Sequence, residues 1–120
     1  MKKIISALLM VLFFTSLSFA AGISRTYETL TTATVKGIST VNLTVNGVRA
    51  SSAFASVEGG DVRCTFNGVT TPTTTVGGSV GHLFLSGTFI NILENSDVKG
   101  FKCINAVGGS GAVVKVTIEF

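Results

Sequence analysis

"VVKVTIEF", residues 113–120, is the stretch that indicates most clearly which fold this sequence forms. Apolar side chains occupy every second position, and the positions between them are charged or carry a hydroxyl group. Successive side chains of a strand point to opposite faces, so one face of this segment is apolar and the other is wet. The segment is therefore predicted to be a half-buried β-strand with its apolar face formed by Val114, Val116, Ile118 and Phe120.

A second alternating segment, residues 40–45, runs directly into Asn46-Gly47. These two residues tolerate the positive φ angles of a two-residue hairpin turn. We therefore expect a hairpin from about residue 39 to residue 57. The returning strand does not decide which of its faces is buried: Ala53 and its alternate neighbours form one face, and Phe54 lies on the other.

The two cysteines lie in further strand-like segments. Cys64 shares the apolar face of residues 62–66 and is expected to point toward the core. In residues 97–104, Val98 is out of phase with Phe101 and Cys103 if the strand is regular. A β-bulge at Gly100 would restore the phase, because one extra residue resets the alternation, and would point Cys103 inward.

The N-terminal residues predict export. Two lysines precede an apolar run, and a short segment ending in small residues follows, which is the layout of a secretory signal peptide with its helical apolar segment. We expect cleavage between Ala20 and Ala21, so that residues 1–20 form the signal peptide and residues 21–120 form one domain. The alternative is an uncleaved membrane anchor. The predicted location is outside the cytoplasm: periplasmic, extracellular or on a particle surface.

Export also sets the redox environment of the cysteines. An even number of cysteines in an exported chain favours a disulfide between Cys64 and Cys103. Closing a loop of roughly 40 residues should stabilise the fold by about 4 kcal/mol in the chain-entropy model. The alternative is two separately buried thiols.

Composition and length limit the fold and the partners. The formal net charge of +3 falls to about +1 when the signal peptide, with Lys2 and Lys3, is removed. The remaining basic residues are scattered, so no nucleic-acid partner is predicted. About 100 residues support one core. The sequence predicts an all-β fold, a single compact antiparallel β-sandwich of the jelly-roll or immunoglobulin-like type with about seven or eight short strands.

The chemistry-bearing residues do not form a convincing active site. His82 is the only histidine, and the glycine-rich segment before it lacks the strand-turn-helix setting of a nucleophile elbow. Glu58 and Asp61 flank a turn, but two carboxylates are too few for a calcium site. We therefore predict no catalytic residue, no cofactor and no bound metal, and we expect that the protein is not an enzyme.

The segment after Cys64 contains a threonine cluster and the only proline. Such a loop could meet a protein or a sugar through its hydroxyl and methyl groups, although threonines are more often simply strand formers on a wet face. The candidate contact loop consists of Thr70, Thr71, Pro72, Thr73, Thr74 and Thr75.

Short motifs follow one another in a distinctive order from residue 53 onward. They are Glu58, Val62-Arg63, Asn67-Gly68, Pro72 to Gly77, Gly81-His82-Leu83, Phe101 to Ile104 and the strand to Phe120. Their order resembles that of small virion-associated proteins of tailed bacteriophages. The resemblance implies a compact β-sandwich that coats or joins a virus particle through homo-oligomeric or lattice contacts, without catalysis. The signal peptide and Cys64, which stands where the pattern usually has an aromatic residue, favour an exported relative.

The segment from Val62 to Thr73 also looks like part of the sandwich modules attached to secreted chitin- and glycan-degrading enzymes. That resemblance implies glycan binding, which would depend on Tyr27 or on the Thr70 to Thr75 loop. The sequence thus predicts an exported structural or surface-assembly module, with a secreted glycan-binding, ligand-binding or adhesion module as the alternative. The expected partner is a second copy or another protein, with membrane contact only through the signal segment.

Overall fold

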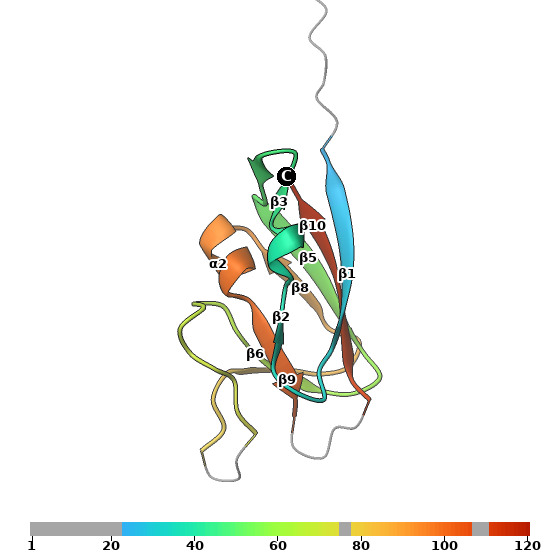
Figure 1. The fold of residues 1–120 in the computed structure, drawn as a ribbon. Helices are drawn as coiled ribbons and strands as arrows, with labels where there is room; N and C mark the ends of the chain where they lie inside the picture. The colour runs from blue at the N-terminus through green and yellow to red at the C-terminus, as the bar shows by residue number, and fades with distance from the viewer. Residues whose placement is uncertain (1–22, 75–77, 107–110) are drawn as a thin grey trace, which may run out of the picture.

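The C-terminal alternating segment is β10 (Val113–Glu119), and it lies inside a four-stranded sheet (Figure 1). Val114, Val116 and Ile118 are buried, as the alternation predicts. The computed structural model describes residues 23–74, 78–106 and 111–120. The predicted signal peptide with its cleavage site at Ala20 and Ala21 lies outside these residues.

Two antiparallel sheets make up most of the described chain. In the first, here called sheet A, the strand order is β1-β10-β5-β8; in the second, sheet B, it is β2-β9-β6-β7. A short ribbon, β3-β4, accompanies them. The elements of sheet A other than β10 are β1 (Arg25–Thr31), β5 (Ser52–Glu58) and β8 (Phe89–Ile92). Sheet B contains β2 (Lys36–Gly37), β9 (Lys102–Asn105), β6 (Val62–Thr65) and β7 (His82–Phe84). The remaining elements are β3 (Thr44–Val45), β4 (Val48–Arg49), the 3-10 turn η1 (Thr40–Asn42) and the helix α2 (Asn95–Gly100).

The prediction of an antiparallel all-β chain with little helix is confirmed. The described residues contain ten strands, more than the seven or eight expected, because β2, β3 and β4 are only two residues long. Buried side chains from both sheets and from α2 form one apolar cluster between the layers. In Figure 1, β1, β10 and β5 form one layer, and β2, β9 and α2 lie beside it. None of the described helices is long and apolar enough to cross a bilayer.

The predicted hairpin over residues 39–57 is wrong except at its turn. Asn46 (φ 51°) and Gly47 (φ 79°) do connect two antiparallel strands, but these are only β3 and β4. The segment before them forms η1 instead of a strand, because the Glu28 carboxylate accepts hydrogen bonds from the backbone N–H of Ser39 and from Asn42 Nδ2. The long strand β5 pairs with β10 and β8 instead of returning along β3.

The predicted β-bulge at Gly100 is also wrong, because α2 takes its place. Val98 and Phe101 are three positions apart, and this spacing puts both side chains on one side of a helical turn. Both are buried in the core. After Phe101 the chain becomes extended, and the strand period brings Cys103 inward. The change from helical to strand periodicity after residue 100 therefore explains how Val98, Phe101 and Cys103 can all point into the core.

The inward direction of both cysteines is confirmed. Cys64 on β6 and Cys103 on β9 are directly opposite each other in sheet B and form a disulfide bond. Both residues are completely buried. The bond therefore cross-links the centre of sheet B inside the core.

Candidate functional site

The candidate contact loop follows β6. Pro72 is fully buried, so this residue of the candidate contact loop is not available for contact with a partner. The Thr70 backbone carbonyl accepts from Thr65 Oγ1 at 2.8 Å, which ties the loop to β6. Thr71 is exposed, whereas Thr73 and Thr74 are partly buried. Thr75 lies outside the described residues.

Hydroxyl groups of this loop are used within the loop itself. Thr70 Oγ1 accepts a hydrogen bond from Asn67 Nδ2, and Asn67 Oδ1 accepts from the Thr70 backbone N–H, each at 2.8 Å. Thr73 Oγ1 bonds to the backbone of Gly78 and Val80. These contacts order the loop, and among residues 70–74 Thr71 is the threonine that is exposed.

His82 begins β7 and is exposed. Its ring lies 6.0 Å from that of Phe66, and it lines a shallow pocket with Thr65 and Thr70. The hydroxyl groups of these two threonines already take part in the hydrogen bonds of the loop. In the described ranges, no three His, Cys, Asp or Glu side chains converge as a metal site would require. The carboxylates of Glu58 and Asp61 instead contact Lys115 and the backbone N–H of Ser86, respectively.

The most distinctive surface is the outward face of sheet A, which carries three exposed aromatic side chains. The relative exposure is 73% for Tyr27 on β1, 42% for Phe54 on β5 and 66% for Phe89 on β8. The rings of Phe54 and Phe89 are stacked, with centroids 5.4 Å apart and an interplanar angle of 19°. We call the surface formed by Tyr27, Phe54 and Phe89 the aromatic face.

The aromatic face exists because of the way in which the side chains of β5 alternate between core and solvent. Ala53, Ala55 and Val57 point into the core, which leaves Phe54 on the outside. Helix α2 packs against β5 on the inner side, and small alanine side chains leave room for it. The face of β5 that the sequence left undecided is therefore selected by packing in the shared core.

The strand register places polar groups between the aromatic rings. Tyr27 is directly opposite Thr117, which is opposite Phe54, and Phe54 is opposite Asn91. Two rings and two polar groups thus alternate along a line that crosses all four strands, and Phe89 lies outside this line, opposite Ser56. Such a row can offer both stacking area and hydrogen-bonding groups to a partner.

The charges on the outward face of sheet A are paired. Lys115 Nζ lies 2.7 Å from Glu58 Oε2, and Arg25 Nε lies 3.0 Å from Glu119 Oε1. The hydrogen bond from Lys115, above all, holds the pKa of Glu58 below its ordinary value. The face is therefore close to neutral in net charge, which favours contact with another apolar surface over electrostatic capture of a charged one.

Tyr27 was the single aromatic residue that the sequence singled out for binding; Phe54 and Phe89 were missed. Alternation alone could not reveal them, because both faces of β5 contain apolar residues. Comparisons of the chain with protein-family models, with curated proteins and with solved structures found no match.

Proposed function

We propose that this chain is an exported, non-enzymatic β-sandwich module, of jelly-roll or immunoglobulin-like type, that assembles with further copies of itself through the aromatic face. The observation that carries the proposal is the stacked Phe54–Phe89 pair exposed beside Tyr27 on a charge-paired sheet. Exposed apolar area of this kind marks interaction surfaces. The resemblance to virion-associated proteins, which implies homo-oligomeric or lattice contacts, supports the same function.

The size of the face defines what kind of assembly it supports. Strands lie about 4.8 Å apart and rise about 3.3 Å per residue, so the outward face of sheet A covers roughly 400 Å². Two copies in face-to-face contact would bury about 800 Å² in total, below the about 1,200 Å² of a standard stable interface. A single contact is therefore weak. A face-to-face contact closes at a dimer, so avidity would arise where many copies are held together on a common particle.

We expect sedimentation of the purified chain to show reversible self-association with a dissociation constant on the order of 100 µM. The double variant Phe54→Ser/Phe89→Ser should remain monomeric up to about 1 mM, because it removes the stacked apolar pair. Leu83→Ser is the matched control. Leu83 is an exposed apolar residue on β7 in sheet B, so its substitution should leave association unchanged.

Thermal unfolding of all three proteins should stay cooperative. Phe54 is only 42% exposed, so its replacement should cost about 2 kcal/mol, and the other two replacements should cost about 1 kcal/mol each. A wild-type chain that is monomeric throughout this concentration range would contradict the proposal. Association that the Phe54→Ser/Phe89→Ser variant retains would equally exclude the aromatic face.

Glycan binding is the second candidate function, and the row of alternating rings and polar groups favours it. Aromatic rings can stack on the apolar faces of sugars while Thr117 and Asn91 bond to hydroxyl groups. In this case the chain should be retarded on an immobilised polysaccharide, and Tyr27→Ala should abolish the retardation. Retardation that depends on Thr71 instead would assign binding to the threonine loop, and no retardation on a broad panel would exclude this candidate.

Export is supported by the signal-peptide pattern and by the buried disulfide, which suits an oxidising compartment. The expected mass of the protein recovered from producing cells corresponds to a chain that begins at Ala21 and has lost a pair of hydrogen atoms to the Cys64–Cys103 bond. Fractionation should place this species outside the cytoplasm or on particles. An intact N-terminus with free thiols in the cytoplasmic fraction would contradict export.

A further inference from the structure

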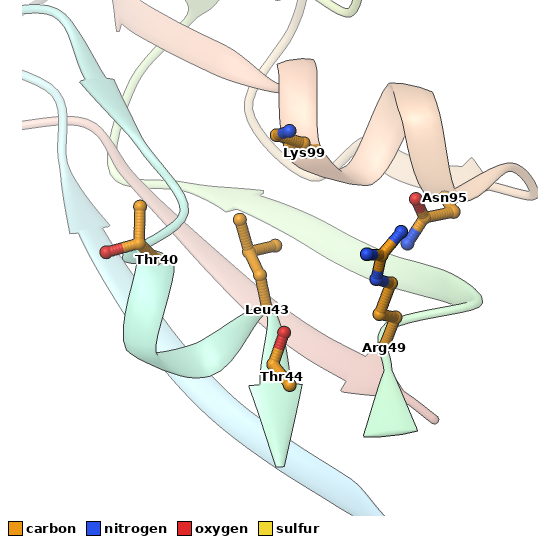
Figure 2. Close-up of a pocket in the computed structure, with 6 residues that line it drawn as sticks. All are labelled: Thr40, Leu43, Thr44, Arg49, Asn95 and Lys99. Atoms are coloured by element: carbon orange, nitrogen blue, oxygen red, sulfur yellow. The ribbon is translucent and has the colours of Figure 1, made fainter. Parts of the chain in front are cut away.

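A small hollow lies where α2 approaches η1 and the β3-β4 ribbon (Figure 2). Its volume is about 300 Å³, and none of its residues belongs to the aromatic face. A site here would therefore be separate from the proposed assembly surface. The lining residues are Thr40, Leu43, Thr44, Arg49, Asn95 and Lys99.

Two cations from distant parts of the sequence line this hollow. Arg49 comes from β4 and Lys99 from α2, and Figure 2 shows the Arg49 side chain extending toward α2. The ion pairs in the described part of the chain are formed by Arg25 and Lys115. In those residues no carboxylate lies within 4.0 Å of the Arg49 or Lys99 side-chain nitrogen atoms. The hollow therefore carries two positive charges, and no described carboxylate forms an ion pair with either of them.

The nearby carboxylates are directed elsewhere. Glu94 and Asp97, at the start of α2, line a different pocket together with Phe66. Glu28, beneath η1, accepts hydrogen bonds from Ser39 and Asn42. An anion bound in the hollow would interact favourably with both cations.

The other lining groups are suited to an anion with oxygen atoms. The guanidinium group of Arg49 offers paired N–H donors, and the ammonium group of Lys99 adds a mobile point charge. Thr40 and Thr44 bring hydroxyl groups, and neither hydroxyl makes a hydrogen bond to another described residue. Asn95 Nδ2 donates to the Ala50 carbonyl and so joins the first turn of α2 to the end of the ribbon.

We propose that this hollow binds a single oxyanion group: a sulfate, phosphate or carboxylate, free or attached to a larger molecule that extends into solvent. The volume of the hollow is at the lower end of the range for ligand pockets. It admits one oxyanion group and the atoms directly attached to that group. Both cations are exposed, so water and salt screen them. Binding is therefore weak, with a dissociation constant in the millimolar range.

The test is a titration of the full folded chain with sodium sulfate, sodium phosphate or sodium acetate, followed by ¹⁵N–¹H NMR, with sodium chloride adjusted to hold the ionic strength constant. Saturating shifts should appear at the amides of residues 43–50 and 95–99. The double variant Arg49→Gln/Lys99→Gln should bind at least about tenfold more weakly, because it removes both charges. The anion with the lowest dissociation constant identifies the group that the site prefers.

Lys36→Gln is the matched control, since Lys36 is an exposed cation on β2 that does not line the hollow. It should bind each anion like the wild type. Shifts that increase linearly without saturation would overturn the proposal, as would an unchanged dissociation constant in the Arg49→Gln/Lys99→Gln variant. The Phe54→Ser/Phe89→Ser variant should bind anions normally, so failure of the assembly proposal leaves this result unaffected.

Discussion

Replacing both cysteines, in a Cys64→Ala/Cys103→Ala variant, should lower the free energy of unfolding by about 4 kcal/mol. The bond closes a loop between positions 39 residues apart, and without it the unfolded chain gains the entropy of that open loop. Both side chains are fully buried, so loss of the sulfur atoms also leaves a small cavity. For a domain of this size the midpoint of thermal unfolding should fall by on the order of 20 °C.

Urea unfolding measures this loss of stability and also tests whether it arises in the unfolded state. The slope of the unfolding free energy against urea concentration should rise in the variant, because an unfolded chain without the cross-link exposes more surface. A reducing agent should shift the wild type toward the variant and leave the variant unchanged. A variant within about 1 kcal/mol of the oxidised wild type would contradict a stabilising role for the disulfide.

The variant Gly100→Ala should destabilise the fold by about 3 kcal/mol, despite the higher helix propensity of alanine. A Cβ atom on Gly100 would lie 1.9 Å from the Phe66 carbonyl oxygen and 2.5 Å from the Gly68 backbone nitrogen. These are backbone atoms, so the chain itself must move. The movement would break the 3.2 Å hydrogen bond from the Gly68 N–H to the Gly100 carbonyl.

Whether Gly100→Ala lowers or raises the free energy of unfolding shows whether Gly100 is in close contact with the backbone of Phe66 and Gly68. If Gly100 served only as a helical residue, alanine would stabilise the protein by about 1 kcal/mol. Gly78→Ala is the control, because a Cβ atom on Gly78 meets no other atom within 4 Å. Chemical denaturation of both variants gives the comparison, and equal stability of the two would show that α2 and the Asn67-Gly68 turn are not in close contact.

The parts of the fold that sequence reasoning predicted correctly depend on neighbouring residues. The alternation of β10 specifies its buried face, and the Asn46-Gly47 turn follows from the positive φ that both residues tolerate. Errors occurred where a distant group competes with a local preference. The Glu28 carboxylate stabilises η1 in place of a strand, although Val41 and Leu43 alternate as a strand would.

The candidate sites depend even more on distant groups. The sequence singled out Tyr27 and the threonine loop, but it could not place Phe54 and Phe89 on the same surface as Tyr27. Arg49 and Lys99 are 50 positions apart and carry no common motif. They line one hollow because the fold brings α2 close to the β3-β4 ribbon, which no local pattern encodes.

The sequence by itself determined the strand-rich class, the apolar face of β10, the turn at Asn46-Gly47 and the inward direction of Cys64. Each of these depends on backbone sterics or side-chain alternation within a few residues. Only the tertiary structure decided that Phe54 faces outward and that residues 95–100 form a helix. Both faces of β5 contain apolar side chains, so their local preferences are similar, and the space available beneath α2 selects the face with the small alanines for the core.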